Sequence, residues 1–357
     1  MIKNFGFLSM EFESEEKRDF RPSFFAGLKN LKQDILLDYD YGKKLGYSNK
    51  DYLDTGCSIR FVDRKEVLNA DCVFSVRTPG LEELKYMKEG AIIVSMLHYI
   101  THEKRNRYLE QKGVKMIALD SVTDDFGTRM IQDFSGTVKN AFEAAYQDFF
   151  LEYKSRNPVN VLVLGTGEIG KIAVDTAVNQ TNRPIIVTAI GISVTSNREY
   201  LSELIKKTDI LVDATKRQNT SKIIVSNEMV GLLPEHAFII DLSADDYDTS
   251  IGPIQVKGIE GIPTGNLGQF VFRPDDPIYD KIPKEVSTKN RRVVISCYSW
   301  PGVNPIACLD RYEIQIEPFI RTLSTIDYDS FQELSNDLYE RALYRATYSS
   351  FLESLKK

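Results

Sequence analysis

Histidine is scarce in this sequence, with three among 357 residues, and cysteine is hardly more common. The four cysteines, Cys57, Cys72, Cys297 and Cys308, form no C-x-x-C pair. Residues so few and so scattered do not favour a zinc site, because zinc needs three or four such ligands at characteristic spacings. We therefore expect no metal, and four free thiols in a reducing compartment.

Long apolar runs and basic blocks are missing as well. No apolar segment approaches the ~18 residues of a membrane-spanning helix, and the start of the chain, MIKNFGFLSMEFESEEKR, turns acidic too early for a secretory signal peptide. The formal net charge is −6, and lysine and arginine form no extended cluster. We expect a cytoplasmic protein with neither a nucleic-acid nor a membrane partner.

What the sequence does contain is an alternation of short β-rich runs with amphipathic helical stretches. This pattern predicts an α/β fold with two Rossmann-like domains, each built on a parallel sheet, and an active site in the cleft between them. A long helix over Gly136–Lys154 separates the two βα series. The expected strands are Ile35–Asp40, Ala70–Val76, Ala91–Met96, Met116–Asp120, Val159–Leu164, Ile185–Ala189, Ile210–Asp213, Phe238–Leu242 and Val293–Cys297. The helices expected besides it are Glu82–Glu89, His102–Lys112, Glu168–Val178, Glu199–Lys207, Asn227–Leu232 and a helical tail over Ile306–Leu355.

A glycine motif follows the strand Val159–Leu164, where the chain reads VLVLGTGEIG. Gly165 allows a tight turn, Gly167 lets a pyrophosphate approach the backbone, and Gly170 lets the next helix pack closely on the strand. Phosphate then meets free N–H groups at the positive end of that helix. The motif predicts a dinucleotide site; a glycine-rich turn that binds no nucleotide is the alternative. The loop residues expected at the cofactor are Gly165, Thr166, Gly167, Glu168, Ile169 and Gly170.

The acidic residue that usually holds the adenosine ribose is absent. No carboxylate occurs between Asp175 and Glu199, so nothing near the end of the next strand favours a free 2′-hydroxyl. Arg198, with nearby hydroxyl side chains, is a candidate for a 2′-phosphate, which gives a slight lean to NADP over NAD; the alternative for Arg198 is a solvated charge. The hydroxyl side chains are those of Ser193, Thr195 and Ser196.

Three polar stretches lie at strand ends, where catalytic groups of α/β proteins collect. SVRTP places Arg77 just past a strand, SMLHYI places His98 at a strand end, and IIDLSADD places Asp241 and Asp245 on and beyond a third strand. Histidine can pass a proton near neutral pH, and arginine can grip a carboxylate with two hydrogen bonds. Each also has a structural interpretation: a packed histidine, a surface arginine and a helix-capping aspartate.

Taken together and in order, these stretches resemble the alanine dehydrogenase/transhydrogenase alpha-subunit family, which includes saccharopine dehydrogenases and carboxyethylornithine synthases. The resemblance covers most of the chain. It rests on EEKRDFRP, YGKKLGYSNKDYLDTGCSI, ADCVFSVRTP, GAIIVSMLH, the helix after FSG, LGTGEIG, IIDLSADD and SWPGVNP. It implies a substrate domain over residues 1–134, completed by the helical segment 306–357, and a dinucleotide-binding domain over residues 135–305.

The resemblance also implies roles for individual residues. The family's proton-exchanging histidine falls on His98, its catalytic aspartate on Asp245, and its substrate-site lysine on Arg77. The family's carboxylate-binding arginine falls on Arg18, although Lys17 holds the ungapped position and Arg21 is an alternative. Glu13, Glu15 and Glu16 are interpreted as a solvated acidic run. The cofactor contacts expected beyond the glycine loop are Ser135, Arg198, Ala214, Thr215, Ser299 and Trp300.

The function expected from these features is an NAD(P)-dependent oxidoreductase acting on a C–N bond. Hydride would pass between nicotinamide C4 and the α-carbon of an imine formed from a 2-oxo acid. An amine partner bulkier than ammonia is favoured, as in saccharopine-like or carboxyethylornithine-like condensation. The alternatives are an alanine dehydrogenase-like enzyme that uses ammonia, a catalytically silent nucleotide-binding protein of the same fold, and a subunit of a larger assembly. A homo-oligomer is expected.

Overall fold

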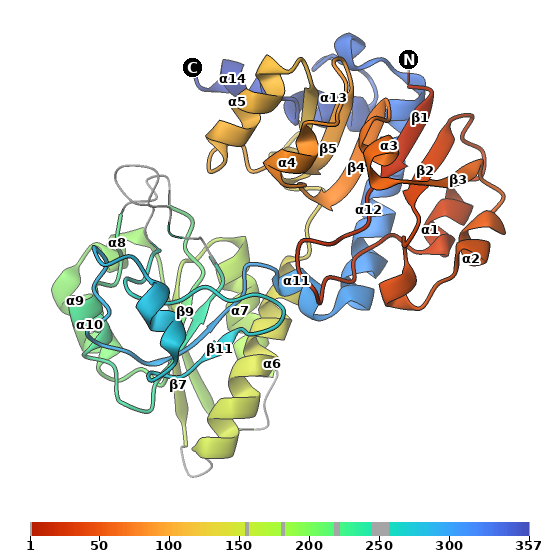
Figure 1. The fold of residues 1–357 in the computed structure, drawn as a ribbon. Helices are drawn as coiled ribbons and strands as arrows, with labels where there is room; N and C mark the ends of the chain where they lie inside the picture. Colours follow the sequence, from red (N-terminus) through yellow and green to blue (C-terminus); the bar gives the residue numbers. More distant parts are fainter. Residues whose placement is uncertain are drawn as a thin grey trace. The chain divides into compact units, whose positions relative to one another are not determined.

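The computed structural model describes residues 2–153, 157–179, 183–217, 222–243, 247 and 257–356. Its internal contacts divide the chain into two compact units. Unit 1 comprises Met1–Asp133 together with Pro305–Lys357, and unit 2 comprises Phe134–Asn304. Each unit carries a six-stranded sheet flanked by helices (Figure 1). The expected fold class, two Rossmann-like domains with mostly parallel sheets, is thereby confirmed.

The sheet of unit 1 is wholly parallel, in the order β3-β2-β1-β4-β5-β6. Because the strands are parallel, their carboxyl ends all lie at one edge, where ligands of open α/β sheets bind. The strands are β1 (Asn4–Phe7), β2 (Asp34–Asp38), β3 (Ile59–Val62), β4 (Cys72–Arg77), β5 (Ile92–Met96) and β6 (Lys115–Ala118).

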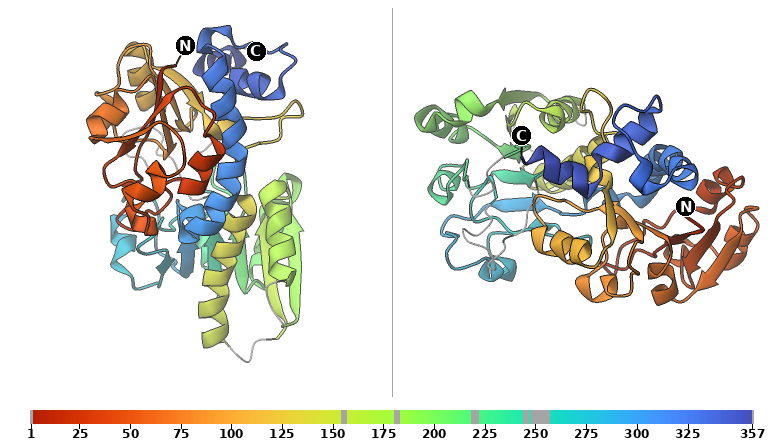
Figure 2. Two further views of the ribbon diagram at one scale, coloured as in Figure 1. Left: turned by 90° about the vertical axis from the view of Figure 1, so that its right-hand side faces the viewer. Right: turned by 90° about the horizontal axis from the view of Figure 1, so that it is seen from above.

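The helices of unit 1 come from both ends of the chain. The 21-residue helix α12 packs along α1 and sends Tyr312, Ile316 and Phe319 into the same core as the strand residues Phe5 and Phe7 (Figure 2). The helices are α1 (Pro22–Gly27), α2 (Asn49–Leu53), α3 (Arg64–Leu68), α4 (Leu81–Leu84), α5 (Glu103–Gln111), α12 (Pro305–Thr325), α13 (Leu338–Arg345) and α14 (Tyr348–Ser354), with 3₁₀ turns η1 (Lys43–Leu45), η2 (Leu119–Ser121) and η4 (Tyr328–Ser330).

The sheet of unit 2 runs β11-β12-β10-β9-β7-β8, with only β11 antiparallel to its neighbour. Its strands are β7 (Val159–Leu164), β8 (Ile185–Ile190), β9 (Ile210–Asp213), β10 (Phe238–Asp241), β11 (Val271–Phe272) and β12 (Val293–Ser296). Its helices are α6 (Phe134–Glu152), α7 (Glu168–Asn179), α8 (Ile192–Thr195), α9 (Arg198–Ile205), α10 (Asn227–Val230) and α11 (Trp300–Val303), with a 3₁₀ turn η3 (Pro277–Lys281).

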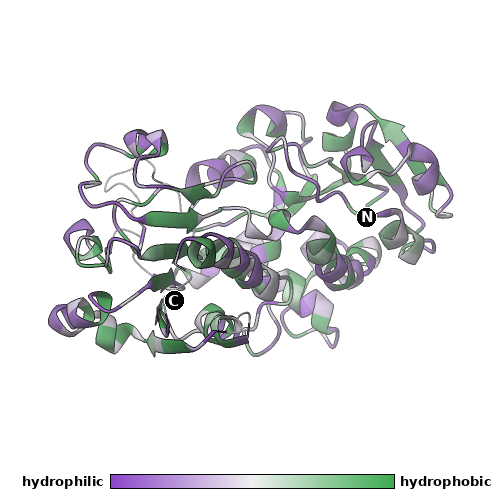
Figure 3. Cartoon of the chain, turned by 90° about the horizontal axis from the view of Figure 1, so that it is seen from below, coloured by the Kyte–Doolittle hydropathy of each residue, from purple (hydrophilic) through white to green (hydrophobic). Residues whose placement is uncertain are grey.

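Hydrophobic periodicity explains how α6 packs in unit 2. Val138, Phe142, Ala145 and Phe149 recur at spacings of three and four residues and are all fully buried. They join the strand residues of β7, β9 and β10 in one core, and each large apolar side chain stabilises it by roughly 1.5–3 kcal/mol. In Figure 3 the strands are the most hydrophobic segments, as expected for a sheet covered on both faces. No helix in the described part of the chain combines the length and the apolar character that crossing a membrane requires.

Several expected elements differ in the structure. The strand expected over Met116–Asp120 ends at Ala118 because residues 119–121 turn into η2, and the expected helix Glu82–Glu89 is the short α4. The tail is three helices rather than one stretch. Strands β1, β3 and β11 were not anticipated. In β1, glycine interrupts the apolar pattern at Gly6, because a Cβ there would lie 2.4 Å from the carbonyl oxygen of Val67 in α3.

Candidate functional site

The glycine loop of unit 2 has the backbone geometry that its sequence predicts. Gly165 has φ 107°, and a Cβ on it would lie 2.5 Å from the Ala214 carbonyl oxygen. A Cβ on Gly170 would lie 2.1 Å from the Gly165 carbonyl oxygen, so α7 can approach β7 only with glycine there. Around Gly167, in contrast, nothing lies within 4 Å of a Cβ position. The loop thus leaves open space at the position where a pyrophosphate approaches the backbone.

The remaining loop residues and the end of β8 surround this turn. Glu168 opens the 12-residue helix α7, whose free N–H groups provide a positive end for phosphate. Gly191, directly after β8, lies near the Thr166 hydroxyl, since a Cβ there would be 3.2 Å from that oxygen. The residues present therefore fit a dinucleotide, which would be held by the backbone of residues 165–170.

Arg198 does not point to the end of β8. Its guanidinium donates to the carbonyl oxygens of Ile224 at 2.7 Å and Ile223 at 3.3 Å. The hydroxyls of Thr195 and Ser196 donate to the Ile192 carbonyl oxygen within their own helical turn. Each of these groups is thus engaged by a backbone carbonyl oxygen, so the lean to NADP that rested on Arg198 is not supported.

The other expected cofactor residues of unit 2 lie at the ends of helices and strands, and two of them are buried. Ser135 lies in the first turn of α6, and Ala214 and Thr215 directly follow β9. Ser299 and Trp300 are both 2% exposed, and the indole N–H of Trp300 donates to the Asp241 carbonyl oxygen at 3.2 Å. Trp300 is thus part of the core at the end of β10. Asp245, the expected catalytic aspartate, lies outside the described residues.

In unit 1 the structure brings His98 together with Asp120, a residue that the sequence did not single out. Asp120 Oδ1 accepts the backbone N–H of His98 at 3.1 Å, and Oδ2 lies 3.4 Å from His98 Nδ1. Burial by itself would raise the pKa of Asp120, but the hydrogen bonds and charge of His98 hold it below its usual value. The imidazole is half exposed, whereas the carboxylate is 12% exposed. A carboxylate that orients a solvent-accessible imidazole is the arrangement of an acid–base pair.

The arginine and glutamate side chains near the start of the chain form a second polar group in unit 1. Arg77 Nη1 lies 2.7 Å from Glu13 Oε1 and 3.4 Å from Glu16 Oε2, and its guanidinium stacks on Phe12. Arg18 binds both oxygens of Glu16, at 2.6 and 3.3 Å. Burial of Glu16 by itself raises its pKa, but the charges of Arg18 and Arg77 prevail and lower it.

Two sequence-based interpretations change here. Glu13 and Glu16 are not a solvated run: their side chains are 8% and 0% exposed, because two arginines compensate them. Arg18, chosen for a substrate carboxylate, is 5% exposed and already holds a carboxylate of this chain. Lys17 is exposed, and Arg21 forms ion pairs with Glu313 and Asp310.

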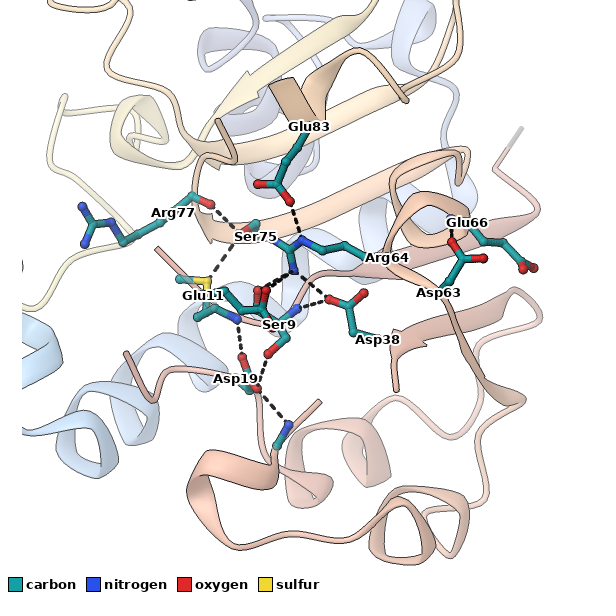
Figure 4. Close-up of polar contacts among 12 residues, drawn as sticks. Ser9, Glu11, Asp19, Asp38, Asp63, Arg64, Glu66, Ser75, Arg77 and Glu83 are labelled. Atoms are coloured by element: carbon teal, nitrogen blue, oxygen red, sulfur yellow. Dashed lines mark hydrogen bonds and ion pairs between the residues drawn. The ribbon is translucent and has the colours of Figure 1, made fainter. Parts of the chain in front are cut away.

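A third polar group, also unanticipated, lies near the carboxyl ends of β1, β2 and β3 (Figure 4). Asp38, at the end of β2, accepts the backbone N–H of Ser9 at 2.6 Å and pairs with Arg64 at 2.9 Å. Arg64 also contacts Glu83, and Asp19 accepts hydrogen bonds from Ser9 and Met10. Burial raises the pKa of Asp38 to about 6. The only sequence signal for these residues was their place just after short strands, two of which were not anticipated.

Comparison with known proteins agrees with the resemblance inferred from the sequence. The family model described as "Alanine dehydrogenase/PNT, N-terminal domain" matches residues 9–135, which include His98, Asp120 and the arginine–glutamate group. Residues 9–135 thus match the amino-terminal domain of this family, as the sequence resemblance predicted. Within the described residues, no three His, Cys, Asp or Glu side chains are grouped as a metal site would need.

Individual relatives are distant but extend beyond that domain. The chain is 25% identical to an N(5)-(carboxyethyl)ornithine synthase of Clostridium botulinum, over 77% of this chain and 84% of the relative. It is 24% identical to an alanine dehydrogenase of Staphylococcus saprophyticus, over 65% and 70%. The match to the NAD(P) transhydrogenase subunit alpha of Haemophilus influenzae, at 26% identity, spans 46% of this chain and only 34% of that protein.

A solved structure of L-alanine dehydrogenase shares the fold. It superposes with a TM-score of 0.71 at 14% sequence identity, and the match covers 96% of this chain and 94% of that chain. Identity this low establishes the architecture alone. It agrees with the expectation of two Rossmann-like domains.

Proposed function

We propose that this protein is an NAD-dependent oxidoreductase that acts on the C–N bond of an amino acid derivative. The observation that carries the proposal is the His98–Asp120 pair, which lies inside the region matched by the family model. A bound nicotinamide supplies or accepts the hydride in this chemistry. The glycine loop of unit 2 would hold the dinucleotide through its backbone, and residues of unit 1 would bind the substrate.

The residues of unit 1 divide the remaining work. His98 exchanges a proton with the nitrogen or oxygen attached to the carbon that is oxidised or reduced, and Asp120 fixes the orientation of the imidazole. Arg77 is the more accessible of the two arginines, at 19% against 5%, and binds the substrate carboxylate directly. Arg18 does not touch the substrate; it positions Glu16, which in turn contacts Arg77. Asp245 is assigned to the substrate amine on the family resemblance alone.

For the substrate, we propose a 2-oxo acid that condenses with an amino acid, and whose imine is then reduced. The coverage of carboxyethylornithine synthase relatives supports this choice. Ammonia in place of the amino acid is the alternative, supported by the alanine dehydrogenase relatives. We propose NAD over NADP because Arg198 is engaged by two backbone carbonyls.

The deciding experiment follows NADH and NADPH oxidation with a panel of 2-oxo acids, each with ammonium or with free amino acids. We expect turnover with NADH and an amino acid, and little with ammonium. His98→Gln should lower kcat by about 10²–10⁴-fold, the range of general acid–base catalysis. His102→Gln, which changes another exposed histidine four residues further along, is the matched control and should leave kcat within about threefold. NADH binding without turnover on any substrate pair would instead support a catalytically silent protein.

A further inference from the structure

Three neighbouring strands of unit 2 end in a buried cluster of polar side chains. Asp213 ends β9 and Asp241 ends β10, and the two are paired in register, as are Asp241 and Ser296 of β12. All three are 0% exposed. Register partners on adjacent strands lie about 5 Å apart. Two carboxylates therefore lie side by side at the carboxyl edge of the sheet.

Lys257 compensates one of these carboxylates. Its side chain is also 0% exposed, and its Nζ lies 2.7 Å from Asp241 Oδ2. The Ser296 hydroxyl donates to the same oxygen at 2.9 Å, while the backbone N–H and hydroxyl of Ser243 donate to Oδ1. Both oxygens of Asp241 are thus engaged, and Asp241 forms a buried ion pair with Lys257.

Asp213 has no comparable partner. Its Oδ1 accepts the backbone N–H and the hydroxyl of Thr215, at 3.0 and 2.6 Å. Its buried Oδ2 has no hydrogen-bond partner among the described residues, and Gly258 presses against it: a Cβ there would lie 2.3 Å away. The positive charge of Arg217 acts in the opposite direction to burial and lowers the pKa of Asp213. One buried lysine faces two buried aspartates, so the cluster is neutral only when one aspartate carries a proton.

Electrostatics identify Asp213 as the proton carrier. Burial first, and then the negative charge of Asp241, raise the pKa of Asp213 to about 6. Near neutral pH, a modest change in the charge around Asp213 can therefore change its protonation, since a shift of one pKa unit requires only about 1.4 kcal/mol.

The cluster also adjoins the phosphate-binding loop. Asp213 immediately precedes Ala214. The Ala214 carbonyl oxygen lies so close to Gly165 that a Cβ on this glycine would be only 2.5 Å from it. The backbone N–H of Ala214 donates to Leu164, the last residue before that glycine, at 2.9 Å. A dinucleotide on the loop brings two negative phosphates close to Asp213, and the low-dielectric surroundings screen the repulsion poorly.

We propose that the dinucleotide binds together with one proton on Asp213, so that the Asp213–Asp241–Lys257 cluster couples cofactor affinity to pH. This inference rests on the proposed function, because it requires a dinucleotide on the glycine loop. The proton neutralises Asp213 and removes its repulsion of the phosphates. Affinity for NADH then falls as the pH rises from about 6 to 8.

The experiment is an NADH titration by nicotinamide fluorescence between pH 5.5 and 8.5 at constant ionic strength. NADH suits it because it lacks the 2′-phosphate of NADPH, which itself titrates near pH 6. We expect the Kd to rise about threefold to tenfold across this range. Asp213→Asn, which mimics the protonated form, should give the tight acidic value throughout. Asp209→Asn is the matched control: this buried aspartate precedes the same strand at its amino end, and the pH dependence should remain.

Two measurements keep the proposal testable if Asp213→Asn fails to fold. Calorimetry of the wild-type protein at pH 7, in buffers of different ionisation enthalpy, should show a net uptake of protons on NADH binding. Asp241→Asn removes the neighbouring charge that opposes ionisation of Asp213 and should flatten the profile above pH 6. NADH binding with a pH-independent Kd and no proton uptake overturns this inference and leaves the proposed function intact. No NADH binding at any pH overturns both.

Discussion

The carboxylate of Asp120 holds His98 at two points, accepting its backbone N–H at 3.1 Å and lying 3.4 Å from its Nδ1. His98 is the one non-glycine residue of the described chain with a positive φ, 45°. For a residue with a Cβ, this conformation costs about 1–2 kcal/mol. Strain maintained at a half-exposed imidazole is typical of a functional residue.

Because the backbone of His98 is strained, a substitution there can lower activity without lowering stability. His98→Gly relieves the left-handed conformation, and the gain roughly offsets the greater flexibility of unfolded glycine. We expect the free energy of unfolding to stay within about 1 kcal/mol of wild type, while turnover falls by about 10²–10⁴-fold. Urea denaturation and steady-state kinetics measure the two effects. A large loss of stability would show that the histidine is retained for packing.

Glu13 and Glu16 share Arg77, but Glu16 also pairs with the buried Arg18, so their substitution should have different effects. Glu13→Gln frees Arg77 for the substrate carboxylate, and we expect the KM for the oxo acid to fall, by roughly threefold to tenfold, as one competing charge is lost. Glu16→Gln leaves Arg18 buried without its counter-ion and should destabilise the fold by about 3–5 kcal/mol. Thermal unfolding and KM measurements distinguish them. Glu15→Gln, at an exposed position, should change neither quantity.

Two glycines of the loop, Gly167 and Gly170, should respond differently to alanine. At Gly170 the added Cβ meets the Gly165 carbonyl oxygen at 2.1 Å, so Gly170→Ala should destabilise unit 2. At Gly167 there is open space, so Gly167→Ala should fold normally but weaken NADH binding by roughly tenfold or more, because the pyrophosphate needs that space. Gly80→Ala, also in open space but in unit 1, is the control for both assays. Unchanged NADH affinity in Gly167→Ala would argue against a phosphate at the loop.

Asp38 should make stability depend on pH. Its pKa is raised to about 6 by burial, so the folded protein holds this proton more tightly than the unfolded chain does. The stabilisation that the proton provides is complete below about pH 4 and is lost as the pH rises through 6, to a limit of roughly 2–3 kcal/mol. Asp38→Asn should remove this part of the slope between pH 4 and 6.5. Urea unfolding of both proteins across that range measures it, and an identical slope in the two would contradict the assignment.

The sequence by itself determined those features that depend on local sterics and periodicity. The bounds of β7 and β9 agree with expectation to the residue, because short apolar runs rich in Val, Ile and Leu and closed by turn residues are typical of buried parallel strands. Gly165 and Gly170 were readable because a tight strand–helix turn excludes a Cβ. The family resemblance was likewise carried by short motifs in a fixed order, and the comparisons confirm it.

Only the tertiary structure decided which charges are compensated. Glu13 and Arg77 are 64 residues apart in sequence, and His98 and Asp120 are 22 apart. Lys257 is a residue type that is usually exposed, yet its side chain is wholly buried and pairs with Asp241. A charged side chain is buried only where a partner compensates it, and in these three pairs the partner comes from a distant part of the sequence, so local sequence does not contain its placement. For this reason, the sequence predicted the dinucleotide loop and the histidine, while the acids that set their electrostatics appeared only in the fold.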